Sequence, residues 1–343
     1  MDSWARLSLY ESTDIVKKLF QKRHNRELNT GKASEIVSAL AQGREYFSSA
    51  ADADLLVRPV LQYYGTLALS RGLILLLSPI LREAALPPSH GLTSNGWGKS
   101  LHNQDPGSLS ASVTKGTFLE LINLNNFELP WVFTGPYPSR TYITRSYNLD
   151  DLPSTSFTFG DIISRVPELR AIYEKSFGKT ANNYQSFIFN IANAHTDIDV
   201  FQSADGLQDE SILREQFSLS AEISMRHSYT HNFVHTYGHF TFRLPHEDNG
   251  ALPSNLPQFE NDNYPYTSII APFPNGVQIP KLGRYFLLAF FLGTLSRYHP
   301  TYWLGMMRGQ QKGDFIMPLI RESMRIIQEN YCTLVIQALE GDH

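Results

Sequence analysis

The stretch LVRPVLQYYGTLALSRGLILLLSP, residues 56–79, decides how the rest of this sequence can fold. Apolar residues recur along it at helical spacing, and Leu69, Leu73 and Leu76 make the helix apolar on its other faces as well. We expect the helix to end near Pro79, because proline lacks the amide hydrogen that a helix needs. A helix that is apolar on all sides must be covered by other elements, so the sequence predicts a helical core around it.

Segments near both ends of the chain are suited to supply that core. Within residues 32–48 the apolar positions recur at helical spacing. Residues 282–296 are apolar nearly all round, and Asp314 is placed to cap a final helix. We therefore expect one helical core assembled from the N-terminal and C-terminal helices.

The middle of the chain has a different composition. Glycine, serine, asparagine and proline separate short segments between residues 89 and 160, which is typical of loops and strands. Further along, runs rich in aromatic and β-branched residues favour extended structure. The segments expected to be strands are 110–113, 117–122, 184–192, 227–244 and 266–273. The helices expected between them are 161–177 and 211–225.

These patterns predict an α+β fold with a mainly α-helical core and an inserted β-containing middle lobe. The expected divisions are 1–88 for the N-terminal helical part, 89–280 for the middle region and 281–343 for the C-terminal helical part. With 42% hydrophobic residues the chain has enough apolar surface to fold without metals or disulfides. Its single cysteine, Cys332, cannot form an intramolecular disulfide.

The composition also limits location and partners. No basic segment followed by an apolar stretch begins the chain, so no secretory signal is predicted. The longest uninterrupted apolar stretches, 73–77 and 286–292, are far shorter than the roughly 20 residues of a membrane-spanning helix. The net charge is −4 and the basic residues are scattered, so no broad surface for a phosphate backbone is expected. We expect a cytoplasmic protein with no membrane partner.

Four short motifs occur in order along most of the chain: RPVLQYYG at 58–65, HGL at 90–92, KGTF at 115–118 and SRYHP at 296–300. Together they resemble the bacterial YaaC-like family, which is known chiefly as a family without an assigned activity. The resemblance implies a helical, cytoplasmic protein of unestablished chemistry. It also implies a distant relation to the HEPN class of helical nucleotide-binding and ribonuclease domains.

Arginines at the apolar helices suggest a binding site. Arg71 lies inside the most apolar helix and Arg297 at the end of another, and an unpaired buried charge is very costly. If the two helices pack together, their basic residues converge on an anionic ligand. The residues expected to bind it are Arg58, Tyr64, Arg71, Arg297 and His299, with Tyr298 as an alternative to Tyr64. The alternative interpretation is that each arginine is paired or extends its charge to solvent.

A second candidate is catalytic. HEPN ribonucleases use an arginine, four to six residues and then a histidine on one helix, so that the two groups stabilise a phosphate and transfer a proton. Arg226 and His231 have this spacing. About two such pairs are expected by chance in a chain with 19 arginines and 11 histidines. The surrounding residues also look extended rather than helical, so the spacing alone is no evidence of catalysis.

Four histidines, His227, His231, His235 and His239, follow one another at intervals of four. This spacing places them on one face of a strand or on one stripe of a helix, where imidazoles could hold a transition metal. On a strand, however, residues four apart are about 13 Å from each other, which is too far for all four to share one ion. The competing interpretation is an aromatic and histidine surface that contacts a base, a nucleotide or another subunit. No cofactor is expected.

Two functions from different classes stay open. The first is a helical binding or interaction protein that acts as a homo-oligomer or with a protein partner, with its tyrosines and phenylalanines as contact surface. The second is a HEPN-like, metal-independent ribonuclease or nucleotide-processing enzyme that acts on RNA or nucleotides. The first is favoured, because the motifs for catalysis do not exceed chance. The sequence does not decide whether the protein is an enzyme.

Overall fold

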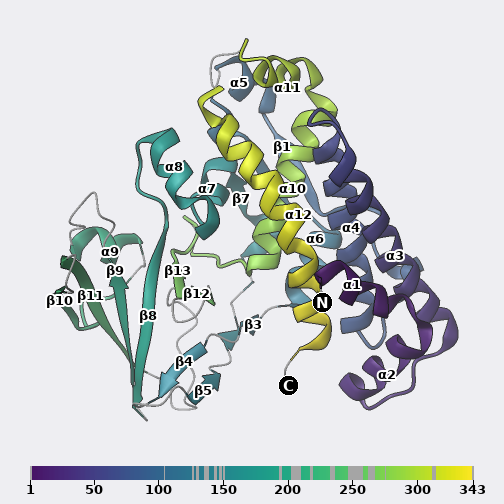
Figure 1. Ribbon diagram of the computed structural model, residues 1–343, viewed down its shortest axis with the longest axis horizontal. Coiled ribbons are helices and arrows are strands. Elements are labelled where there is room, and N and C mark those ends of the chain that lie inside the picture. The colour runs from purple at the N-terminus through teal and green to yellow at the C-terminus, as the bar shows by residue number, and fades with distance from the viewer. Residues whose placement is uncertain are drawn as a thin grey trace.

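Helix α4 (Arg58–Leu77) lies at the centre of a helical core in the structure, which is a computed structural model. Its neighbours are α3 (Thr30–Asp52), α10 (Lys281–Tyr298) and α12 (Met317–Glu340), which come from both ends of the chain (Figure 1). The expected α+β fold with a core from both termini is therefore confirmed.

The described parts of the chain are residues 2–103, 105–125, 127–128, 131–134, 139–142, 145–146, 149, 151–192, 195–201, 210–216, 219–231, 236–245, 258–261, 267–274, 276–310 and 314–341. The other α-helices in these parts are α1 (Ser3–Leu7), α2 (Thr13–His24), α5 (Trp97–His102), α6 (Thr117–Leu124), α7 (Phe159–Ile163), α8 (Arg170–Phe177), α9 (Glu210–Gln216) and α11 (Pro300–Met307).

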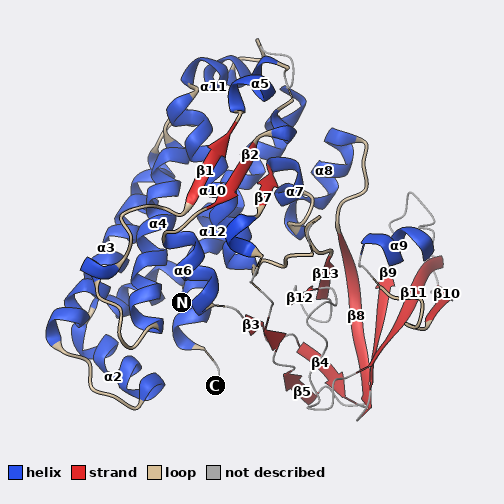
Figure 2. Cartoon of the chain, turned by 180° about the vertical axis from the view of Figure 1, so that it is seen from behind, coloured by secondary structure: helices blue, strands red, loops and turns tan. Residues whose placement is uncertain are grey.

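Two main sheets occur in the described parts, and their strands pair antiparallel except for β4 with β8. The smaller sheet has the order β1-β2-β7 and lies against the helical core (Figure 2). Its strands are β1 (Leu92–Asn95), β2 (Ser110–Val113) and β7 (Ser156–Thr158).

The larger sheet has the order β10-β11-β9-β8-β13-β12 and forms a lobe beside the core (Figure 2). Its strands are β8 (Asn183–Ala192), β9 (His195–Phe201), β10 (Met225–His231), β11 (Thr236–Pro245), β12 (Gln258–Asn261) and β13 (Thr267–Ile270). Strand β4 (Trp131–Thr134) joins this sheet through β8 and pairs with β5 (Ser139–Tyr142), while β3 (Phe127–Glu128) pairs with β6 (Arg145–Ser146).

Glycines set the close contact between α3 and α4. A Cβ at Gly43 would lie 2.5 Å from the side chain of Leu69, and a Cβ at Gly65 would lie 2.6 Å from that of Phe47. A Cβ at Gly72 would similarly come within 2.8 Å of a side chain of α3. Real Cβ atoms do not approach this closely, so the two helices lie together because these positions carry no side chain.

Helix α4 is long and apolar enough to cross a membrane by length and composition alone. Within the protein, 72% of the tested segment is buried against other elements. Extensive burial is what a core helix requires, so this feature is weak evidence for a membrane span.

The buried hydrophobic side chains form two clusters. One cluster contains the helical core together with residues from 92 to 181, such as Phe118 and Phe157. A second cluster runs from Tyr184 to Ala271 and belongs to the larger sheet and α9. The first half of the region 89–280 therefore packs into the helical core. The expected divisions 1–88, 89–280 and 281–343 stay a prediction.

The sequence-based expectation of a strand at 117–122 is wrong. These residues begin helix α6, in which Phe118, Leu121 and Ile122 are fully buried. Their spacing of three and four residues places them on one helical face, and this face packs against α4. The periodicity of the apolar residues thus indicates the helix at 117–122 better than the nearby glycine and serine residues, which suggest loops and strands.

Two expected helices are shorter than the sequence suggested. Residues 161–177 are divided into α7 and α8, because Pro167 cannot continue a helix and begins a 3₁₀ turn instead. The helix expected at 211–225 ends at Gln216, and strand β10 already begins at Met225. The expected strands 110–113 and 184–192 are confirmed as β2 and β8, and the strand expected at 266–273 is confirmed over 267–270 as β13. In the extended run 227–244, the described residues belong to the antiparallel strands β10 and β11.

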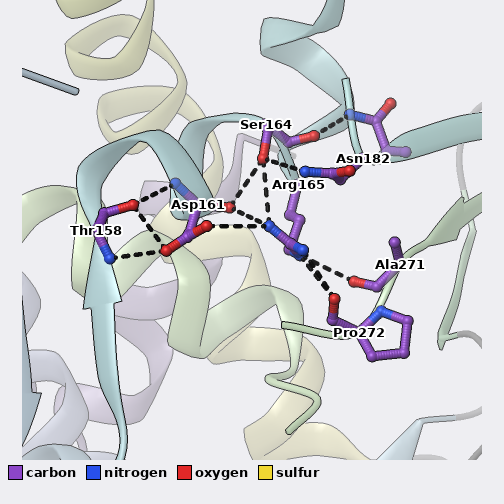
Figure 3. A network of polar contacts seen from close by, with 8 residues as sticks. Thr158, Asp161, Ser164, Arg165, Asn182, Ala271 and Pro272 are labelled. Atoms are coloured by element: carbon purple, nitrogen blue, oxygen red, sulfur yellow. Dashed lines mark hydrogen bonds and ion pairs between the residues drawn. The ribbon is translucent and has the colours of Figure 1, made fainter. Parts of the chain in front are cut away.

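The buried Arg165 joins the core to the lobe (Figure 3). Its guanidinium donates to the carbonyls of Ala271 and Pro272 at 3.0 and 2.8 Å, where the chain leaves the lobe. The chain passes from the core into β8 beside it, where Asn182 donates its backbone N–H to the Ser164 carbonyl. Burial lowers the pKa of Arg165 to about 10, and the carboxylate of Asp161 opposes this shift. Ser164 and Arg165 therefore hold the start of β8 and the segment after β13 close to each other.

A second polar contact joins α10 to β12. Arg284 is fully buried and forms an ion pair with Glu260. Its guanidinium also donates to the Gln258 side chain at 3.1 Å and to the Ile279 carbonyl at 2.7 Å. A buried ion pair needs such additional hydrogen bonds to offset the loss of hydration.

We expect Glu260→Gln to lower the free energy of unfolding by about 3 kcal/mol, because Arg284 would keep its buried charge and lose its counter-ion. Urea denaturation measures this change. The matched control is Glu329→Gln, which removes a carboxylate from the exposed ion pair with Arg325 and should cost less than about 1 kcal/mol. Equal losses for the two variants would contradict the structural role assigned to Glu260.

Candidate functional site

Four segments that are far apart in sequence meet where α4 packs on α10. They are residues 58–65, 90–92, 115–118 and 296–300. Their side chains, with one from α3, form a group of tyrosines around an arginine and a histidine. We call this group the tyrosine–arginine site; its members are Tyr46, Tyr63, Tyr64, His90, Arg297 and Tyr298.

Tyr63 forms the buried floor of the site. It is 4% exposed, and its ring lies near those of His90 and Phe290, with centroid distances of 6.1 and 6.0 Å. A Cβ at Gly293 of α10 would lie 2.7 Å from Tyr63, so the absent side chain makes room for the tyrosine. The Tyr63 hydroxyl has no hydrogen-bond partner among the described residues. Burial raises its pKa, and the charge of Arg297 opposes this rise, so the hydroxyl stays protonated.

Backbone contacts with the start of α6 hold the loop that carries His90. Thr117 and Phe118 donate their N–H groups to the carbonyls of Ser89 and His90, both at 3.0 Å. These bonds satisfy two amides that the first turn of a helix leaves without partners. A Cβ at Gly116 would lie only 2.3 Å from the backbone nitrogen of Gly91. The position of His90 therefore depends on close contact between two backbone segments.

The His90 ring is a neutral hydrogen-bond donor. Its Nδ1 atom accepts the Leu92 N–H at 3.2 Å, so the neutral ring carries its proton on Nε2. Burial and, next, the positive charge of Arg297 lower the pKa of His90 below its ordinary value. Near pH 7 the ring is therefore uncharged and presents an N–H group.

Arg297 lies at the end of α10 between two tyrosine rings. Its guanidinium carbon is 5.7 Å from the ring centroid of Tyr64 and 4.2 Å from that of Tyr298. One nitrogen also donates to the Tyr64 hydroxyl. In the described part of the chain no carboxylate lies within ion-pair distance of Arg297, and the residue is exposed. The rings fix the plane of the guanidinium and leave its charge open to an external anion.

The structure does not bring all the predicted anion-binding residues together. Arg58 donates to the carbonyl of Ala53 at 2.8 Å, and Arg71 to that of Pro87 at 3.1 Å. The two arginines are 13 residues apart on one helix (71 − 58), which is roughly 20 Å. Each arginine thus binds a backbone carbonyl in a different loop. Of the predicted residues, only Tyr64 contacts Arg297. Ligand binding by Arg58 and Arg71 stays a prediction.

His299 lies outside the tyrosine–arginine site. Its ring stacks on Trp97 with a centroid distance of 5.8 Å, and Trp97 in turn stacks on Phe291 at 5.5 Å. Burial lowers the pKa of His299. The residue packs against α5, and its predicted role in ligand binding stays a prediction.

The other predicted sites lie in the lobe. Arg226 and His231 both belong to strand β10, so the helical arrangement of a HEPN arginine–histidine pair is not formed there. The side chain of Arg226 is exposed. The side chain of His231 lies outside the described residues.

The expectation that the four histidines share one face is wrong for His227 and His239. The chain forms a hairpin, in which His227 pairs with Phe240 and His239 pairs with Ser228. Because side chains alternate along strands, these two histidines lie on opposite faces of the sheet. His239 approaches Asp199 to 3.9 Å, whereas His227 packs on Phe240. His235 lies outside the described residues, and within the described ones no group of three or more metal-binding residues occurs.

Tyr63 and His90 were missed as site residues, although both belong to motifs noted in the sequence. Tyr63 lies within the apolar helix predicted at 56–79, where a tyrosine hydroxyl needs a partner. A histidine directly before Gly91 also indicated a fixed loop. Neither signal identified Arg297 as the neighbour, because that contact joins residues more than 200 positions apart.

Comparison with known proteins gives one match. A family model described as YaaC-like Protein matches residues 8–339, which is nearly the whole chain. No curated protein and no solved structure matches significantly.

We expect Gly116→Ala to lower the free energy of unfolding by at least about 1–3 kcal/mol, because the new Cβ would collide with the backbone of Gly91. The His90 pKa, followed by NMR, should shift at the same time. Gly98→Ala is the matched control, since no atom lies within 4 Å of its added Cβ. Alanine there should be neutral or stabilising by up to about 1 kcal/mol. An unchanged stability of Gly116→Ala would contradict the close contact.

Proposed function

The chain belongs to the YaaC-like family, and we propose that it is a binding protein whose tyrosine–arginine site holds a phosphate-bearing ligand. The observation that carries this proposal is the exposed guanidinium of Arg297, held between two tyrosine rings with no carboxylate partner among the described residues. A planar guanidinium forms two parallel hydrogen bonds to phosphate oxygens. Holding it in place before binding reduces the entropy that the ligand must overcome.

Two uncharged donors beside Arg297 support the proposal. The neutral His90 ring carries a proton on Nε2, and no described group accepts it. The Tyr63 hydroxyl is buried and lacks a hydrogen-bond partner in the described part of the chain. A buried donor without a partner costs about 1–3 kcal/mol, which gives this hydroxyl a reason to hydrogen-bond to any group that reaches it. One cation and two neutral donors together suit an anion with several oxygens.

Binding is proposed rather than catalysis. No described contact favours the HEPN-like ribonuclease, because Arg226 and His231 lie on a strand. Cytoplasmic location and a homo-oligomer or protein partner stay predictions. Size-exclusion chromatography with light scattering would test the oligomeric state.

We expect Arg297→Ala to weaken the binding of inorganic phosphate by about 10- to 100-fold, which corresponds to the loss of a charged hydrogen-bonding group. The phosphate affinity of Arg297→Lys should lie between those of Arg297→Ala and the unchanged protein, because lysine keeps the charge and loses the planar pair of donors. Isothermal titration calorimetry measures these affinities. Arg308→Ala, which removes another exposed arginine near the same end of the core, should bind phosphate like the unchanged protein. Equal binding by Arg297→Ala would refute the proposal.

We expect sulfate to bind more tightly as the pH falls from 8 towards 5. The pKa of free His90 lies below its ordinary value, and a nearby anion would raise it. Binding therefore takes up a proton in this range, and the affinity gain levels off below the pKa of free His90. Sulfate is the suitable probe because its own charge stays constant here.

His90→Gln keeps an N–H donor and removes the titrating ring, so its sulfate affinity should be nearly independent of pH. His299→Gln is the control, because burial also lowers the pKa of His299 but its ring stacks on Trp97 outside the site. If the pH dependence persists in His90→Gln and disappears in His299→Gln, the proton is taken up by His299, and the role assigned to His90 is wrong.

A further inference from the structure

Arg297 is part of a longer row of contacting planar groups. The ring of Tyr46, on α3, stacks on Tyr64 with a centroid distance of 5.7 Å and an interplanar angle of 28°. The Arg297 guanidinium follows at 5.7 Å from the Tyr64 centroid, and the Tyr298 ring follows at 4.2 Å from the guanidinium. The four groups come from three segments: Tyr46 from α3, Tyr64 from α4, and Arg297 and Tyr298 from the end of α10.

The row ends in solvent at Tyr298. This side chain is 60% exposed, the highest value among the described tyrosines and phenylalanines. Exposing so much of an aromatic ring is unfavourable unless a partner covers it. The ring is also oriented, because the guanidinium lies over it. An ordered, exposed ring beside a free positive charge is a platform on which another flat ring can stack.

We propose that the ligand is a mononucleotide, whose phosphate binds Arg297 and whose base stacks on Tyr298. This inference rests on the proposed function, since it assumes that the site holds a phosphate. It adds that the ligand has a planar ring joined to the phosphate by a short linker. Every nucleobase has a flat face suited to such stacking, so the contact does not select among the bases.

The charge pattern supports a small ligand. The site offers one arginine, and the next arginines on α4 are occupied by the carbonyls of Ala53 and Pro87. A protein that follows a polynucleotide backbone needs several cations along its path. One cation, a buried hydroxyl, a half-buried imidazole and one exposed ring match one phosphate and one base.

The test compares three probes by isothermal titration calorimetry: adenosine 5′-monophosphate, ribose 5-phosphate, which lacks the base, and adenosine, which lacks the phosphate. We expect the monophosphate to bind about 10-fold more tightly than ribose 5-phosphate, a difference within the range of base–aromatic stacking. Adenosine should bind most weakly, because it does not engage Arg297.

Two variants locate the contribution of the base. In Tyr298→Ala, the affinity for the monophosphate should fall to within about two-fold of the affinity for ribose 5-phosphate. Tyr298→Phe keeps a stacking face and should retain the difference in affinity. Ribose 5-phosphate binding serves as the check that Tyr298→Ala leaves Arg297 in place. Phe315→Ala is the matched control, because it removes another exposed aromatic ring, 45% exposed, outside the site.

The outcomes separate the two proposals. If ribose 5-phosphate and the monophosphate bind equally to the unchanged protein, the nucleotide inference is wrong and the phosphate site stands. If the advantage of the monophosphate persists in Tyr298→Ala, the base lies elsewhere and the inference is also wrong. If no phosphate probe binds, the proposed function itself fails, and the nucleotide inference with it.

Discussion

The close packing of α4 against its neighbours is the constraint on which the rest of the structure depends. Three glycines allow it to lie against α3, and Gly293 of α10 leaves room for Tyr63. Because α4 is buried along most of its length, its few polar groups are restricted to places where neighbours can accept them. The same packing brings Tyr64 beside the end of α10. The tyrosine–arginine site is therefore a direct consequence of how closely these helices approach.

The chain places its arginines in two kinds of environment. Arg165 and Arg284 are buried at the junction of core and lobe, where backbone carbonyls and carboxylates surround them. Their contacts stabilise the position of the lobe. Arg297 has only aromatic rings and a hydroxyl around it among the described residues, and solvent on its open side. A charge that the fold holds in place without a counter-ion is better suited to recognising an external anion than one already satisfied.

The sequence was informative where the apolar residues repeat regularly. The periodicity along 56–79 and 282–296 predicted α4 and α10, and the motif SRYHP placed Arg297 at the end of an apolar helix. It was less informative where composition was weighed above periodicity, as at 117–122, which is helix α6. The regular spacing of the histidines did not predict a shared face, because His227 and His239 belong to two antiparallel strands whose register places them on opposite faces.

The sequence by itself determined the local elements and the need for partners: a helix apolar on every face must be buried, and an arginine within or at the end of such a helix must reach solvent, a carboxylate or an anion. Only the tertiary structure decided which partner each arginine received. Arg58, Arg71 and Arg297 have the same chemistry, yet two are bound by nearby carbonyls and the third lies between Tyr64 and Tyr298. The physical reason is that periodicity is a property of neighbouring residues, whereas an electrostatic environment depends on distances between segments that folding brings together.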